Sequence, residues 1–214
     1  MPARGLQAPT TRTRIDLPID FSGLPNTMRR YIAVLLSTLA CFAAPAFNAS
    51  GEESAMSLTL TSSFEPGGAI PTRHTCQGAD VSPPLAWAGV PAHAKSLALI
   101  VDDPDAPDPA APKVVWVHWV LYNIPPSASA LQENAGSAGG GALPAGARQG
   151  MNDFQHAQYN GPCPPIGRHR YFVKLYALDT VLPDLGKPDK AALETAMKGH
   201  IVAHGELVGT YQKH

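Results

Sequence analysis

A proline-rich stretch that continues into a long apolar segment, residues 161–179, constrains the fold more than any other part of the chain. Its first part holds three prolines within residues 162–165, and proline lacks the backbone donor that helices and central strands need. From Tyr171 onward, aromatic, β-branched and aliphatic residues predict a strand. His169 and Tyr171 would share one face of that strand, because residues two apart point the same way. The stretch therefore predicts a stiff loop that places two polar side chains at the start of a strand.

The rest of the sequence also favours β structure. The chain holds 22 prolines and 19 glycines, which is typical of a loop-rich β protein. Short apolar or alternating runs predict further strands at residues 58–62, 96–102, 114–124 and 207–211. One helix is expected, with Asp189 as its N-cap and Gly199 near its end. These elements predict a mainly β domain, an antiparallel β-sandwich with one or two short helices.

Residues 28–46 have the pattern of a secretory signal peptide. Arg29 and Arg30 form a positive start, residues 31–44 are uncharged and mostly apolar, and Ala-Pro-Ala follows where a signal peptidase cleaves after small residues. The apolar run is too short to span a bilayer. We therefore expect export, which would place the mature protein in the periplasm or outside the cell, with no stable membrane insertion after cleavage.

The signal peptide divides the chain into three parts. Residues 1–27 are interpreted as an upstream extension, either disordered or produced by a misplaced start codon, and residues 50–214 as the mature domain. Cys41 raises the alternative of a lipoprotein anchor, but the residues before it make a poor lipobox. Cleavage would remove Cys41 and leave Cys76 and Cys163, which can pair in an oxidising compartment. Their pairing stays open, because the sequence does not give their separation in space.

The charge of the mature part argues against nucleic acid as a partner. After residue 47 the chain carries 11 Lys and Arg against 15 Asp and Glu. Such a mildly acidic body has no basic stripe for a phosphate backbone.

Polar side chains cluster at the predicted strand ends. They are Asp102, Asp103, Asp105, His118, His169 and Tyr171. If they converge, imidazole and phenol groups can donate hydrogen bonds to a phosphate-like oxyanion, and a carboxylate can orient one imidazole. Taken singly, each is more often a satisfied core residue or a solvated turn residue, so spacing alone is a weak signal.

Other kinds of site fit the sequence less well. No H-E-x-x-H pattern supports a metal centre. No G-x-S-x-G elbow supports a serine hydrolase. A nucleophilic Cys163 would need a lowered pKa, and its proline-rich surroundings suit a structural role better. We expect neither a metal nor a cofactor.

Several motifs together resemble the phosphatidylethanolamine-binding protein family. They are DPDAP at 103–107, WVHW at 116–119, GPCPPIGRHRY at 161–171, CQGADVSPPLAW at 76–87 and LYALD at 175–179. The chain is similar to the bacterial branch of this family, described as Raf kinase inhibitor-like, over roughly residues 58–211. The resemblance implies a β-sandwich of the family's type with a small anion-binding pocket at one end.

The resemblance also implies roles for individual residues. The expected ligand-binding residues are Asp103, His118, His169 and Tyr171 in a polar ring, with Pro107, Trp116, Gly161 and Pro162 as rim and walls. Asp105 and Arg170 are expected to be structural.

The function expected on these grounds is non-enzymatic binding of a small ligand that carries phosphate or carboxylate, with His118 and His169 donating hydrogen bonds and Asp103 orienting one of them. One alternative is an inhibitor or modulator of another protein, such as a serine protease. The other is a phosphoester hydrolase that uses His118 or His169 as general acid or base. A protein partner and a homodimer both stay open.

Overall fold

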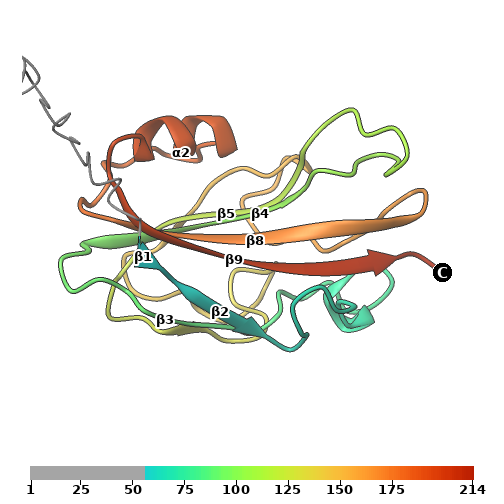
Figure 1. Ribbon diagram of the computed structural model, residues 1–214, viewed down its shortest axis with the longest axis horizontal. Helices are drawn as coiled ribbons and strands as arrows, with labels where there is room; N and C mark the ends of the chain where they lie inside the picture. Colours follow the sequence, from blue (N-terminus) through green and yellow to red (C-terminus); the bar gives the residue numbers. More distant parts are fainter. Residues whose placement is uncertain (1–55) are drawn as a thin grey trace, which may run out of the picture. The chain divides into compact units, whose positions relative to one another are not determined.

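The structure, a computed structural model, describes residues 56–214, which form two β-sheets packed face to face (Figure 1). The predicted signal peptide and the extension before it lie outside the described residues. The expectation of a mainly β, antiparallel β-sandwich with one or two short helices is confirmed. No helix within residues 56–214 has the length and apolarity needed to cross a membrane.

The large sheet has six strands in the order β1-β9-β8-β4-β5-β7, and the small sheet has the order β2-β3-β6. Neighbouring strands run antiparallel, except that β1 is parallel to β9. The strands are β1 (Met56–Ser57), β2 (Thr59–Ser62), β3 (Leu85–Ala88), β4 (Ser96–Asp103), β5 (Trp116–Ile124), β6 (Ala130–Leu131), β7 (Arg148–Gln149), β8 (Arg168–Leu178) and β9 (Ile201–Gln212). A 3-10 helix, η1 (Thr72–His74), and one α-helix, α2 (Lys190–Met197), complete the domain.

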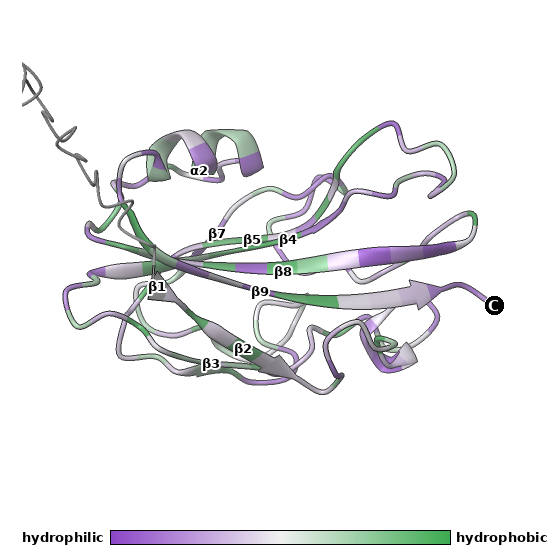
Figure 2. Ribbon diagram, in the orientation of Figure 1, coloured by the Kyte–Doolittle hydropathy of each residue, from purple (hydrophilic) through white to green (hydrophobic). Residues whose placement is uncertain are grey.

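The central strands of the large sheet are covered on both faces. One face packs on the small sheet around residues such as Leu99, Trp119 and Leu175. The other packs under α2 around Ile100 and Val120. This double burial explains why β4 is buried along its whole length. Towards its start, β8 instead alternates buried and accessible residues, and Figure 2 shows hydrophobic and hydrophilic residues along it.

Helix α2 lies over the outer face of the large sheet (Figure 1). The predicted N-cap is present: the Asp189 side chain accepts a hydrogen bond of 2.8 Å from the Ala192 amide. Leu193 and Met197 are buried against the sheet, four residues apart on one face of the helix.

The strand pairing brings three chain segments to one end of the sandwich. β4 runs antiparallel to both β5 and β8, so the end of β4 lies beside the starts of the other two strands. Asp103 pairs with Trp116 of β5, and Asp102 pairs with Phe172 of β8. The polar residues that are far apart in the sequence therefore meet at this end.

Candidate functional site

A cavity of about 270 Å³ opens at the end of the large sheet where these segments meet. Its lining residues are Asp103, Ala106, Pro107, Trp116, His118, Phe154, Cys163, Pro164, Pro165, His169 and Tyr171. They include six of the eight residues expected to bind a ligand. β4 contributes the carboxylate, β5 and β8 contribute the imidazoles and the phenol, and the proline-rich loop before β8 forms one wall.

Asp103 and His169 form a buried pair. The Asp103 Oδ2 atom lies 2.7 Å from His169 Nδ1, and the His169 ring is fully buried. The other ring nitrogen, Nε2, lies 2.9 Å from the Ile166 carbonyl oxygen. With Asp103 ionised, both nitrogens face acceptors, and only the doubly protonated ring satisfies both. His169 was expected to donate to a ligand, but its two donors are taken by the protein.

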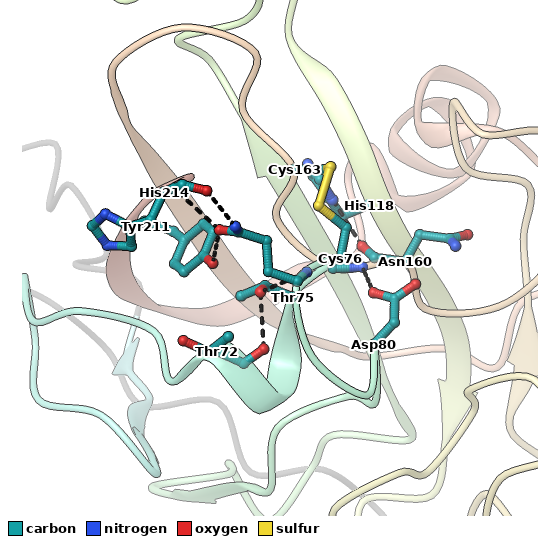
Figure 3. Close-up of a disulfide and its surroundings, with 11 residues drawn as sticks. Thr72, Thr75, Cys76, Asp80, His118, Asn160, Cys163, Tyr211 and His214 are labelled. Carbon is teal, nitrogen blue, oxygen red and sulfur yellow. Dashed lines mark hydrogen bonds between the residues drawn. A yellow bond between two sulfur atoms is a disulfide. The ribbon is translucent and has the colours of Figure 1, made fainter.

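His118 keeps one ring nitrogen free. Its Nδ1 atom lies 2.7 Å from the Asn160 carbonyl oxygen, so this nitrogen carries the proton. Figure 3 draws both residues beside the disulfide. Nε2 is buried and has no hydrogen-bond partner within the described residues. Burial lowers the pKa of His118, and the Asn160 carbonyl and the Asp103 carboxylate oppose this only in part. The ring is therefore neutral in the free protein near pH 7, with the Nε2 lone pair unused.

The Tyr171 hydroxyl is the second unsatisfied group. It is buried and makes no hydrogen bond to the described residues. Burial, and then the nearby Asp103 carboxylate, raise the pKa of Tyr171, which keeps the hydroxyl protonated as a donor. The Tyr171 ring stands edge-on to His118, with the ring centres 5.2 Å apart. Two unpaired polar atoms therefore belong to neighbouring side chains of the cavity lining.

Gly161 and Pro162, expected at the rim, do not line this cavity. The Gly161 amide donates 2.7 Å to the Asp80 side chain, and a Cβ at Gly161 would lie only 2.2 Å from the His74 carbonyl oxygen. Pro162 lines a small buried space behind His118 and Tyr171. Both residues thus support the cavity wall without lining the cavity itself.

A disulfide fastens the same wall. Cys76 and Cys163 are bonded, with Cα atoms 5.4 Å apart (Figure 3). Cys163 lines the cavity, whereas Cys76 follows η1 on the surface. The Gln77 side chain, next along the chain, accepts from the Tyr211 hydroxyl at 2.6 Å. The turn after η1 therefore connects the cavity wall to the end of β9.

Asp105 and Arg170 stabilise the turn that follows β4. The Arg170 Nη2 atom donates 2.7 Å to Asp105 Oδ1, and the Arg170 amide donates 2.9 Å to Oδ2. The hydrogen bond from the Arg170 side chain lowers the pKa of Asp105. Neither residue lines the cavity. The Asp105 amide in turn donates 2.8 Å to Asp103, which fixes the cavity carboxylate.

Sequence reasoning missed two residues of the loop between β7 and β8. Phe154 lines the cavity, and its ring centre lies 5.5 Å from that of Trp116 and 5.5 Å from that of His118. Asn160 orients His118 through its backbone carbonyl. A carbonyl leaves no mark on residue type, so only the irregular, aromatic-containing approach to the proline-rich stretch could have pointed to this loop.

Within residues 56–214 no group of three or more His, Cys, Asp or Glu side chains is placed to hold a metal ion.

Comparison with known proteins gives consistent matches. Residues 60–212 match the family described as phosphatidylethanolamine-binding protein. A UPF0098 protein of Methanothermobacter thermautotrophicus is 51% identical over 153 residues, which are 72% of this chain and 97% of that protein. The crystal structure of CT736 from Chlamydia trachomatis, a putative phosphatidylethanolamine-binding protein homologue, has a TM-score of 0.67 at 44% identity and covers 74% of this chain and 99% of that one. Escherichia coli YbcL, described as a member of the mammalian family, has a TM-score of 0.66 at 35% identity, covering 73% and 99%.

Proposed function

The chain belongs to the phosphatidylethanolamine-binding protein family, and we propose that its cavity binds a small ligand through a phosphate or carboxylate group. One observation carries the proposal: two buried polar atoms of lining residues, Tyr171 Oη and His118 Nε2, have no hydrogen-bond partner within residues 56–214. A buried polar group without a partner costs about 1–3 kcal/mol. A ligand that supplies both missing hydrogen bonds recovers that cost.

The chemistry of the two atoms favours an oxyanion. The Tyr171 hydroxyl makes no hydrogen bond to any residue that the structure describes, and it can donate to a ligand oxygen. His118 Nε2 becomes a second donor once the ring takes up a proton, which a nearby anion favours. The negative charge of Asp103 does not prevent anion binding, because the His169 ring, 2.7 Å away, pairs with that carboxylate.

Apolar residues around the opening strengthen these hydrogen bonds and extend the site. Trp116, Phe154 and the prolines exclude water from the lining. Beside the opening, Val114 and Ile166 expose 49% and 56% of their surface. Val114 is bonded to Ala106 of the lining, and Ile166 follows Pro165 of the lining. These exposed apolar side chains suit a ligand whose anionic group carries an apolar substituent.

The same geometry favours binding over turnover. The lining Cys163 is held in a disulfide and offers no thiolate. Both nitrogens of His169 face protein acceptors, so this ring cannot exchange a proton with a ligand without losing a bond. Among the described lining residues, His118 offers the one imidazole with an unused lone pair, and the Tyr171 hydroxyl stays protonated, so the lining supplies neither a second base nor a nucleophile.

We further propose that the protein acts outside the cytoplasm. The signal-peptide pattern at residues 28–46 supports this, and so does the Cys76–Cys163 bond, because disulfides persist in oxidising compartments.

Titration calorimetry on the mature protein tests the binding proposal. Phosphate, phosphoethanolamine, acetate and dihexanoyl phosphatidylethanolamine are the probes. We expect heat from the anions, tightest for the probe with acyl chains, and at least about 10-fold weaker binding in His118→Gln. His200→Gln, which alters an exposed histidine paired with Asp179, is the matched control and should bind as the wild type does. Absence of binding by every probe, or full affinity in His118→Gln, would refute the proposal.

A further inference from the structure

A serine outside the cavity lining is hydrogen-bonded to a buried histidine. Ser63 follows β2 and is exposed, and His74 ends η1 and is 2% exposed. The Ser63 Oγ atom lies 3.1 Å from His74 Nε2. Neither residue belongs to the lining of the proposed ligand site.

The partners of His74 fix which ring nitrogen carries the proton. Its Nδ1 atom lies 3.0 Å from the Val81 carbonyl oxygen, which can only accept, so Nδ1 is protonated. In the neutral ring Nε2 is then an acceptor, and the Ser63 hydroxyl donates to it. A hydroxyl, a base within hydrogen-bond reach and a third group that orients the base are the arrangement that activates serine nucleophiles. Here a backbone carbonyl orients the base.

Ser63 also borders a groove of about 320 Å³. The lining residues are Thr61, Ser62, Ser63, Pro84, Leu85, Ala86, Ala130, Leu131 and Gln132, none of which is charged. Two charged residues are neighbours in sequence of this site, Arg73 of His74 and Glu133 of Gln132, and they pair with each other at 2.7 Å. Gln132 brings a side-chain amide, which is the kind of donor that stabilises an oxyanion. A neutral groove with small side chains suits an uncharged ester with a short acyl group.

We propose that Ser63 is a nucleophile for acyl transfer from uncharged carboxylic esters, with His74 as its general base. The Ser63 oxygen attacks the ester carbonyl carbon while its proton passes to His74 Nε2. The bond to the leaving alcohol then breaks, and the alcohol takes that proton. Water next attacks the acyl-serine and gives a proton to His74. The carboxylic acid departs as Ser63 regains its proton.

Diisopropyl fluorophosphate, which modifies activated serines, tests this on the folded mature protein, with peptide mass spectrometry to locate the adduct. We expect modification of Ser63 at least about 10-fold faster than of Ser127, an exposed serine with no histidine partner in the described residues. Turnover of p-nitrophenyl acetate should accompany it. Ser63→Ala should abolish both the Ser63 adduct and the turnover, and Ser127→Ala should change neither.

His74→Gln should slow the reaction at Ser63 by about 100-fold. Because His74 is buried, circular dichroism must first show that this variant folds. If the His74→Gln variant does not fold, the wild-type protein provides the test: the faster labelling of Ser63 than of Ser127 must disappear when urea unfolds the protein. Equal rates at the two serines in the folded protein, or unchanged labelling in a folded His74→Gln, would overturn the proposal.

Discussion

Asp102 and Asp103, consecutive residues at the end of β4, direct their buried carboxylates to opposite faces of the large sheet. Asp102 lies 2.9 Å from Lys174 Nζ and also bonds Lys190, the first residue of α2. Asp103 bonds His169 at 2.7 Å within the cavity lining. Because side chains alternate along a strand, one strand end thus fastens a helix on one side and shapes a pocket on the other.

The two carboxylates predict a matched pair of variants. Asp102→Asn leaves Lys174 and Lys190, which are 26% and 20% exposed, without their anion, and should lower the free energy of unfolding by about 1–2 kcal/mol. Asp103→Asn leaves the buried His169 ring without its anion and should cost about 3 kcal/mol. Only Asp103→Asn should change His169, whose ring nitrogens should shift in NMR from the imidazolium pattern towards the neutral one. Urea unfolding and ¹⁵N spectra near pH 7 provide the two readouts. A neutral His169 in the wild type would contradict the doubly protonated ring inferred from its two acceptors.

Tyr171→Phe should have opposite effects on binding and stability. It removes a buried hydroxyl that has no hydrogen-bond partner in the described part of the chain, so the free energy of unfolding should stay constant or rise by up to about 1 kcal/mol. Anion affinity should fall by about 10- to 100-fold, because a hydrogen bond to a charged group is lost. Tyr159→Phe is the control: its hydroxyl donates 2.7 Å to the His74 carbonyl, so this variant should lose about 1 kcal/mol of stability and keep its affinity. Equal effects of the two variants would argue against the assigned role of Tyr171.

Anion binding should be coupled to proton uptake by His118. Burial lowers the pKa of His118 below its ordinary value of 6.5, and a bound anion would raise it again. Affinity for sulfate, which does not titrate in this range, should therefore increase as the pH falls through the window between these two pKa values. The increase should approach about tenfold per pH unit.

The free protein should show the opposite trend. A histidine whose pKa is lower in the folded than in the unfolded state costs stability as the pH falls below about 6.5 and on through the folded pKa.

Calorimetry in buffers of different ionisation enthalpy measures the protons taken up when the anion binds, and His118→Gln should remove this uptake. Sulfate binding that does not change between pH 5 and 8 would exclude the coupling.

Residue type predicted the long strands of the large sheet well, because their aromatic and β-branched runs are buried on one or both faces. It predicted β9 only in part, from residue 207 on, although the strand begins at Ile201. Gly205 explains the difference: a Cβ there would lie 2.1 Å from the Leu58 carbonyl oxygen. The glycine is present because two segments approach closely, and propensity counts it against a strand.

The candidate site was also predictable only in part. The sequence motifs indicated which charged and aromatic side chains gather at the strand ends. They could not indicate that the Asn160 and Ile166 carbonyls face His118 and His169. Those backbone oxygens determine which ring nitrogens are available to a ligand. Because both nitrogens of His169 are bonded within the protein, we assign the role of donor to the ligand to Tyr171 instead. Such information depends on loop conformation and has no counterpart in residue type.

The disulfide should stabilise the fold and the cavity wall together. The bond joins residues 87 positions apart, and closing a loop of that size stabilises a protein by about 4–5 kcal/mol relative to the reduced chain. The Cys76→Ser, Cys163→Ser double variant should therefore lose about that much free energy of unfolding, and reduction of the wild type should give the same value. Because Cys163 lines the cavity, both forms should also bind phosphoethanolamine several-fold more weakly than the oxidised protein.

Two hydrogen bonds could hold the wall without the disulfide. The Cys76 amide donates 3.1 Å to the Pro162 carbonyl, and the Gly161 amide donates 2.7 Å to Asp80. Asp80→Ala in the oxidised protein separates the two contributions, because it removes one of these bonds and keeps the disulfide. If the disulfide dominates, Asp80→Ala should keep nearly full affinity while the reduced wild type loses it. The reverse result, with full affinity after reduction and a loss in Asp80→Ala, would assign the wall to the hydrogen bonds and leave the disulfide a role in stability alone.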